Sequence, residues 1–145
     1  MAKKDLHNLI RLRKWDVDEK RRSLATLLRH EEAVIERQHA LEAEIQMEMA
    51  FAANAPVELR GTLPGYIALS DEKRERLAQA LREVQTRVAY AQDELAEAYR
   101  RSKTLEVTQA NRDREEELEL ARKEEEDLNE IGLNLFRRRA VAETA

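Results

Sequence analysis

The chain has 145 residues, of which 39% are charged and 4% aromatic, and its formal net charge is −4. This composition excludes a conventional compact core and favours long helices with one apolar stripe each, because hydrophobic residues still reach 42%. The absence of cysteine excludes disulfides and thiolate metal sites, and the small net charge gives no indication of nucleic-acid binding.

The first predicted element is a helix over residues 3–54. Hydrophobic residues recur there at the two seam positions of a seven-residue repeat, the pattern of a coiled coil. One position holds Ile10, Val17, Leu24, Ile45 and Ala52, and the other holds Leu27, Val34 and Leu41. Polar residues at five further seam positions make the pattern imperfect.

A turn is predicted over residues 55–65. Pro56 ends the first helix, since proline removes a backbone donor and disfavours helix at the residue before it. The only other breakers are Gly61, Pro64 and Gly65. Either Thr62 or Ser70 is suited to cap the next helix, and the sequence leaves this choice open. The apolar residues around the turn are expected to plug the end of a hairpin; they are Phe51, Val57, Leu59, Leu63, Tyr66 and Ile67.

The second predicted element is a helix over residues 66–139, followed by a frayed tail over 140–145. Its first half keeps one heptad register in which Ser102 is the only polar residue. The apolar members are Leu77, Leu81, Val84, Val88, Ala91, Leu95, Ala98 and Leu105. The pattern lapses over residues 108–117 and resumes out of phase at Leu118, Ala121, Leu128 and Leu135.

Two long helices joined by one turn predict an all-α fold, a single antiparallel two-helix coiled coil that forms a long helical hairpin over residues 1–145. Folding near residue 62 would set residue i against residue 124 − i. The five cations of residues 3–14 would then face the five anions of residues 110–121. The second helix would have no partner in the first beyond about residue 122.

The uncovered end of the second helix is the predicted partner-binding surface. Leu128, Ile131, Leu135 and Phe136 fall on one side of it at helical spacing, and Arg137, Arg138 and Arg139 follow. Apolar anchors rimmed by charge are typical of protein–protein interfaces. Trp15 lies off the seam of the first helix and is a further candidate anchor, although it is equally suited to covering neighbouring aliphatic side chains.

No residue pattern indicates an enzyme, a metal site or a cofactor. The glycines form no phosphate-binding loop, and His7, His30 and His39 lack the spacing of metal ligands. The basic stretch of residues 11–22 is interrupted by Asp16, Asp18 and Glu19, which argues against a DNA-binding zipper. We therefore expect a protein that acts by binding other proteins.

The opening LHNLIRLRKWDVDEKRRSLATLLR and the closing KTLEVTQANRDREEELELARKEEEDLNEIGLNLFRRR resemble the FliJ family of the flagellar type III export apparatus. The resemblance extends over essentially the whole chain. It implies a cytoplasmic protein, located at the inner membrane when assembled, with the architecture of a rotary ATPase stalk. The implied partners are the hexameric export ATPase FliI, the export gate protein FlhA and export chaperones.

Two other classes of function use similar helices. Prefoldin-like chaperones place β-hairpins between long helices, but residues 55–69 leave little room for one. A structural coiled-coil oligomer would instead use the apolar stripe of residues 118–136 for self-association.

Overall fold

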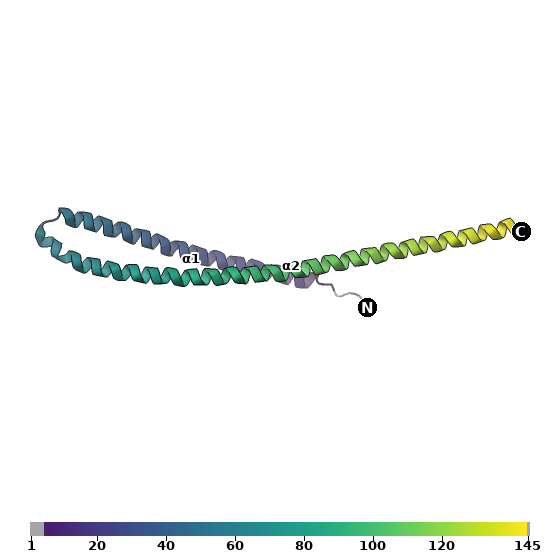
Figure 1. Ribbon diagram of the computed structural model, residues 1–145, viewed down its shortest axis with the longest axis horizontal. Coiled ribbons are helices and arrows are strands. Elements are labelled where there is room, and N and C mark those ends of the chain that lie inside the picture. The colour runs from purple at the N-terminus through teal and green to yellow at the C-terminus, as the bar shows by residue number, and fades with distance from the viewer. Residues whose placement is uncertain (1–4, 145) are drawn as a thin grey trace. The chain divides into compact units, whose positions relative to one another are not determined.

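The computed structural model describes residues 5–144, which form two long α-helices joined by a short 3-10 helix (Figure 1). Helix α1 spans His7–Asn54, η1 spans Val57–Thr62 and α2 spans Leu63–Thr144. The two long helices pack against each other, which confirms the predicted all-α hairpin. The described residues include no strand, so the β-hairpins of a prefoldin-like chaperone have no counterpart among them.

The helix ends differ from the predicted ones by a few residues. Helix α1 begins at His7, and the predicted starting residues 3 and 4 lie outside the described residues. Helix α2 begins at Leu63 instead of residue 66, because Pro64 is tolerated in the first helical turn. It continues to Thr144 through the alanine-rich end that was predicted to fray. Ser70 is buried inside α2 and is therefore not a helix start.

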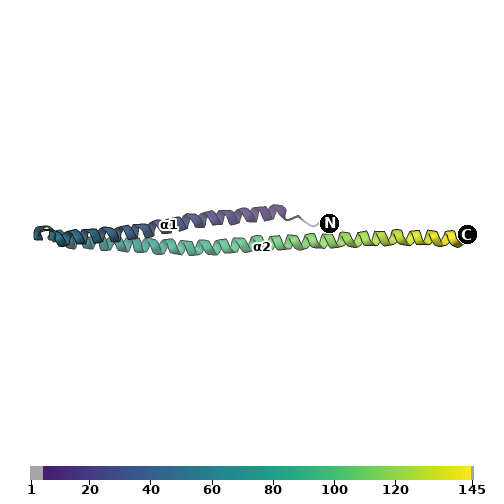
Figure 2. The ribbon, with the colours of Figure 1, turned by 90° about the horizontal axis from the view of Figure 1, so that it is seen from above.

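The chain divides into two compact units, one of residues 14–99 and the other of residues 1–13 with 100–145. In the first, α1 and α2 lie side by side and antiparallel in both views (Figures 1 and 2). The buried seam of this unit contains Val17, Val34, Leu41, Ile45, Val84, Val88, Ala91 and Ala98. All eight are residues that the heptad pattern placed at the seam, so the predicted core of this unit is confirmed.

Polar residues at the seam of the unit 14–99 remain partly exposed. Lys20, Glu31 and Gln38 are half-buried, and the Lys20 Nζ lies 3.5 Å from the Glu94 Oε2 of the facing helix. Long side chains of this kind cover the seam with their aliphatic stems while their polar ends stay in water. The imperfect heptad pattern is therefore compatible with a continuous interface.

Arg74 makes an extensive polar contact between the helices of the unit 14–99. Its Nε and Nη2 donate to Glu42 Oε1 and Oε2 at 2.6 and 2.9 Å, and its Nη1 lies 2.9 Å from Asp71 Oδ1. Paired hydrogen bonds between guanidinium and carboxylate are directional and therefore fix the relative position of the two helices. They also lower the pKa of Glu42 and raise that of Arg74.

These contacts show that the predicted pairing of the helices is wrong. In the unit 14–99 the residue numbers of Lys20–Glu94 and Glu42–Arg74 add to 114 and 116, whereas a turn centred on residue 62 requires 124. In the other unit Leu6 pairs with Gln109. Residues 5–13 therefore do not face the acidic residues 110–121, so the inferred attraction is incorrect for them, and residues 3 and 4 lie outside the described residues. The physical reason is that the turn is shorter than predicted and α2 starts sooner.

Three features of the chain account for the end of α1 at Asn54. Pro56 cannot continue the helix, and the amide of Ala55 donates to the Ala52 carbonyl at 3.3 Å. The Arg60 guanidinium donates to the carbonyl oxygens of Ala55 and Ala53, both at 3.1 Å. The arginine thus satisfies carbonyls that the helix leaves unpaired at its C-terminus, where a cation is also electrostatically favourable.

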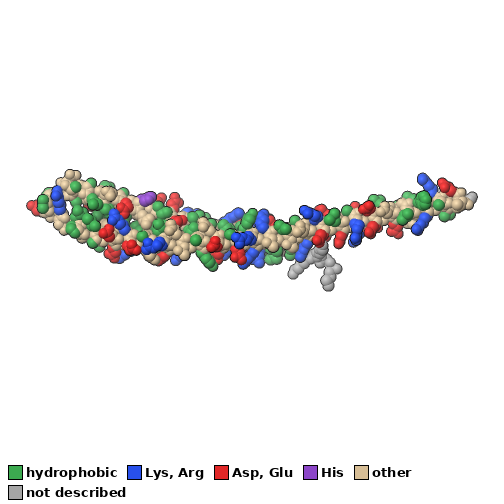
Figure 3. Space-filling model, in the orientation of Figure 1, with side chains coloured by type: hydrophobic (Ala, Val, Ile, Leu, Met, Phe, Trp, Pro, Cys, Tyr) green, Lys and Arg blue, Asp and Glu red, His purple; other side chains and the backbone are tan. Residues whose placement is uncertain are grey.

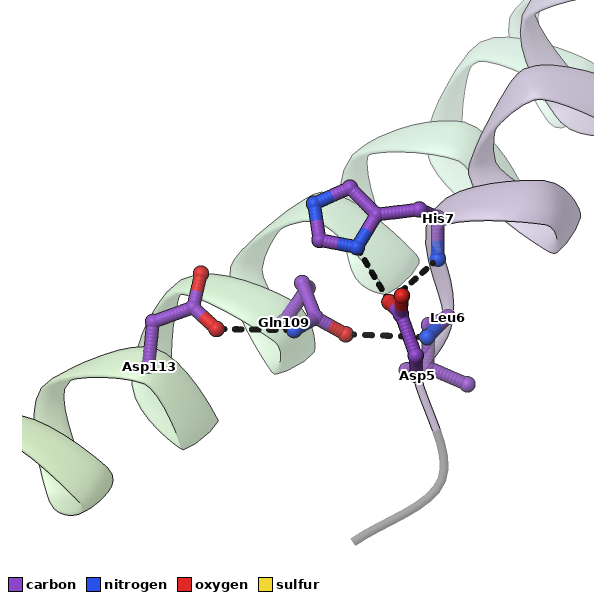
Figure 4. Close-up of polar contacts among 5 residues, drawn as sticks. All are labelled: Asp5, Leu6, His7, Gln109 and Asp113. Atoms are coloured by element: carbon purple, nitrogen blue, oxygen red, sulfur yellow. Dashed lines mark hydrogen bonds and ion pairs between the residues drawn. The ribbon is translucent and has the colours of Figure 1, made fainter.

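The start of α1 belongs to the second unit and is held by a small polar network (Figure 4). The Leu6 amide donates to Gln109 Oε1 at 3.1 Å, and Gln109 Nε2 donates to Asp113 Oδ1 at 2.8 Å. The Asp5 carboxylate accepts from the His7 amide at 3.0 Å and also contacts the His7 ring. This backbone hydrogen bond lowers the pKa of Asp5.

We expect Val88→Asp to destabilise the hairpin by about 3 kcal/mol or more, because Val88 is only 7% exposed and the new carboxylate would be buried without a partner. Thermal unfolding followed by circular dichroism measures the effect. Gln85→Asp, which places the same charge on the exposed side of α2, serves as the control. Equal melting temperatures for the two variants would show that the seam is assigned incorrectly.

We expect Glu42→Gln to lower the melting temperature at pH 7 but not in strong acid. The pKa of Glu42 is lowered from 4.5 in the folded chain, so its ion pair stabilises the fold above that pH and is lost as the pH falls. The difference in melting temperature between wild type and variant should therefore shrink below pH 4.5. Glu44→Gln, at an exposed position of the same helix, serves as the control.

Candidate partner-binding surfaces

The last 32 described residues, Asp113 to Thr144, are exposed along their entire length, and we call them the uncovered segment. Arg112 is the last residue of α2 that is even half-buried. At 1.5 Å per residue the segment is about 48 Å of single helix. It begins about nine residues before the predicted boundary at residue 122, because α1 pairs with an earlier part of α2 than the sequence suggested.

The four predicted apolar anchors all lie in the uncovered segment. Leu128 is 68% exposed, Ile131 55%, Leu135 60% and Phe136 71%. With 3.6 residues per turn they occupy an arc of about 140° on one side of the helix. Because the four side chains lie on one side of the helix, a single partner surface could contact all of them.

The three arginines differ in their position around the helix. By the same helical spacing Arg139 falls near the centre of the stripe, Arg138 at its edge and Arg137 on the opposite side. Gly132 leaves a shallow depression beside Leu135, Phe136 and Arg139. Nothing lies within 4 Å of the position that a Cβ would take there, so packing within the chain does not require a glycine.

The charges of the uncovered segment are separated along its length. Residues 113–130 carry ten acidic and three basic side chains, whereas residues 131–144 carry three arginines and one glutamate. Acidic side chains accordingly predominate over the first part of this segment in Figure 3. A partner surface that followed the helix would meet first an acidic and then a basic region.

Trp15 is the remaining predicted anchor, and it belongs to the other unit. Its side chain is 60% exposed on α1, so it is available to a partner. The structure therefore groups seven of the eight predicted residues on one stretch of helix and places Trp15 in a different unit.

The turn of the unit 14–99 is less closed than predicted. Phe51, Val57 and Leu59 are 67%, 78% and 57% exposed, so they do not plug the end of the hairpin. Leu63, Tyr66 and Ile67 are half-buried. Phe51 lies near the end of α1, and Val57 and Leu59 lie in η1, which contains no buried residue. Hydrophobic side chains are accordingly gathered around the turn in Figure 3.

Two features of these surfaces were missed in the sequence. One is Leu120, which is 60% exposed and, with the already predicted Leu118 at 65%, extends the apolar surface of the uncovered segment toward its start at Asp113. The lapse of the heptad pattern at residue 108 was the available signal for an earlier boundary. The other missed feature is a hollow at the turn, for which the sequence contains no signal, because it depends on how the turn packs.

The described residues contain no group of three or more His, Cys, Asp or Glu side chains that could hold a metal ion. His7, His30 and His39 are all exposed. Within residues 5–144, no helix combines the length and the hydrophobicity needed to cross a membrane.

The family model described as "Flagellar FliJ protein" matches residues 2–141 of the chain. No curated protein and no solved structure gives a significant match. The match covers both helices and most of the uncovered segment, in agreement with the resemblance seen in the opening and closing sequences.

We expect backbone amides of residues 113–144 to exchange with deuterium far faster than those of residues 77–98. Both stretches are helical, but only the second is packed against α1, and tertiary packing provides most of the stability of a helix in water. Hydrogen exchange read by mass spectrometry measures this directly. Equal protection of the two stretches would show that the uncovered segment is covered in solution.

Proposed function

Since the chain belongs to the FliJ family, whose members are components of the flagellar type III export apparatus, we propose that it acts there as a stalk and adaptor. In this role it binds the hexameric export ATPase through the uncovered segment. It contacts the export gate and export chaperones through surfaces nearer the turn. It works at the cytoplasmic face of the inner membrane.

The observation that carries this proposal is the uncovered segment itself. In this exposed helix of about 48 Å the apolar stripe is in contact with water, whereas insertion of the helix into a ring would bury the stripe. Leu128, Ile131, Leu135 and Phe136 supply the apolar anchors. Removing large apolar side chains from water is the main source of affinity at the centre of an interface.

The charged residues of the segment support a role in orientation. Arg139 lies near the centre of the stripe and Arg138 at its edge, both close to its C-terminal end, whereas acidic residues predominate over residues 113–130. Separated charges of this kind fix the direction in which a helix enters a partner and raise the association rate more than the final affinity. Within the helix, Arg122 Nε also lies 3.7 Å from Glu126 Oε1, an i,i+4 pair that supports helicity.

A helix with one apolar stripe is asymmetric, whereas a ring of six identical subunits presents the same surface six times. The stripe can therefore contact only one or two subunits at once. Its binding favours the conformation of the subunits that it contacts, and this difference between subunits is how the stalk would stimulate hydrolysis in the ring. The family is one of structural or adaptor proteins, and we propose that this chain has no catalytic activity of its own.

We expect Phe136→Ala to weaken stimulation of the cognate export ATPase about tenfold or more at subsaturating protein, because loss of a buried aromatic anchor typically costs about 2 kcal/mol. Leu133→Ala provides the matched control. Leu133 is 55% exposed in the same turn but lies outside the stripe by helical spacing. A steady-state ATPase titration with each variant measures the effect.

Truncation after Arg112 extends the same test. The truncated chain should keep the melting temperature of the packed helices and lose all stimulation, because the uncovered segment makes no contribution to the buried seam. Full stimulation by the truncated chain, or equal loss with Phe136→Ala and Leu133→Ala, would place the ATPase contact elsewhere, for example around Trp15.

A further inference from the structure

A hollow of about 330 Å³ lies at the turn of the unit 14–99, and we call it the turn hollow. Its apolar wall consists of Phe51, Ala52, Ala55, Leu59 and Leu63. Glu48, Thr62 and Tyr66 supply its polar groups. The hollow exists because α1 and α2 separate around η1 and the side chains on that turn are too few to fill the space.

The rim of the turn hollow is unusually apolar for an exposed surface. Phe51 and Leu59 are 67% and 57% exposed, and Met47, about one helical turn before Phe51, and Val57, at the start of η1, are 74% and 78% exposed. Exposed apolar side chains that gather around a concave site are typical of a surface that receives another molecule. Because they are mostly free of packing, these side chains can also move apart to admit one.

The Tyr66 hydroxyl provides a second, independent indication that the turn hollow binds another molecule. Its oxygen is buried and has no hydrogen-bond partner among the described residues. A buried polar atom without a partner destabilises the free protein, and phenylalanine would give the same packing without that penalty. Tyr66 lines the hollow, so a group that enters it and displaces the side chains over this hydroxyl gains a hydrogen bond there.

The excess of acidic side chains around the turn favours a positively charged binding partner. Residues 44–69 contain three carboxylates, Glu44, Glu48 and Glu58, and one cation, Arg60. The Arg60 guanidinium is already bonded to the carbonyl oxygens of Ala53 and Ala55. Glu48 lines the hollow, so an entering group with a positive charge next to its apolar part is favoured.

We propose that the turn hollow receives one large apolar side chain, most suitably aromatic, from a partner protein in which that residue adjoins a lysine or arginine. The apolar group fills the hollow beside Phe51, the adjoining cation pairs with Glu48, and the Tyr66 hydroxyl donates to a carbonyl oxygen of the partner. The volume is at the lower end of small-molecule sites and suits a single side chain. This inference rests on the proposed adaptor function, to which it adds the chemistry of one partner contact.

The test uses the full chain and two dipeptide probes, N-acetyl-phenylalanyl-arginine amide and N-acetyl-phenylalanyl-glutamate amide. Titration followed by NMR chemical shifts of the alanine methyl groups should show shifts at Ala52 and Ala55, and the arginine probe should bind about tenfold more tightly than the glutamate probe. Glu48→Lys should reverse this preference. Glu36→Lys, at an exposed position far from the hollow on α1, should leave it unchanged.

Tyr66→Phe distinguishes a binding role from a structural one. The variant should melt about 2–4 °C higher than wild type, because the unpartnered hydroxyl is gone, and yet bind the arginine probe several-fold more weakly. Tyr90→Phe is the control, since Tyr90 is 66% exposed and does not line the hollow. A lower melting temperature for Tyr66→Phe would mean that the hydroxyl is satisfied within the folded chain and would contradict the proposal.

Three other outcomes would also overturn it. One is the absence of shifts at Ala52 and Ala55 with either probe, and another is equal binding of the two probes. The third is concentration-dependent self-association of the full chain, measured by sedimentation velocity. If Ala52→Leu abolished this self-association and Ala53→Leu did not, the occupant of the hollow would be a second copy of this chain. None of these outcomes depends on ATPase stimulation, so they neither support nor contradict the proposed stalk function.

Discussion

The narrow apolar seam between α1 and α2 is the constraint on which the rest of this structure depends. With 39% charged residues the chain has only enough apolar side chains for one stripe per helix. Valine and alanine dominate the buried part of that stripe, including Val34, Val84, Ala91 and Ala98, and small residues allow the two backbones to approach closely. Most of the described helical residues outside the stripe remain in contact with water and are available for charge or for binding.

The position of the helices along the seam determines which residues are left over. A heptad pattern alone permits several pairings that differ by whole turns, since each brings apolar residues together. Directional contacts such as Arg74–Glu42 and Leu6–Gln109 distinguish among them. With this pairing α2 is uncovered from residue 113 onward. The polar contacts between the helices therefore also fix the length of the exposed segment.

The two exposed surfaces have different physical characters. The uncovered segment is a convex helix with an apolar stripe and separated charges, and a partner that surrounded it or provided a groove would bury the stripe. The turn hollow is concave and acidic, and it is suited to a single side chain. An adaptor that must hold two partners at once benefits from such a difference, because neither partner can occupy the surface of the other.

The sequence by itself determined the helices, the seam and the apolar stripe. Heptad spacing identified residues such as Val17, Val34, Val88 and Ala98 as buried, because a helix presents every third or fourth residue to the same side regardless of what it packs against. For the same reason it grouped Leu128, Ile131 and Leu135 on one side. The opening and closing segments were sufficient to indicate the family.

Only the tertiary structure decided how the helices pair, where the uncovered segment begins and what forms at the turn. Pairing depends on the exact path of the chain between Asn54 and Leu63, and periodicity contains no information about that path. The shorter turn moved the facing residues by about nine positions and removed the expected match between the basic and acidic ends. The turn hollow and the buried Tyr66 hydroxyl arise from three-dimensional packing of residues 48–66, so no local pattern could have predicted them.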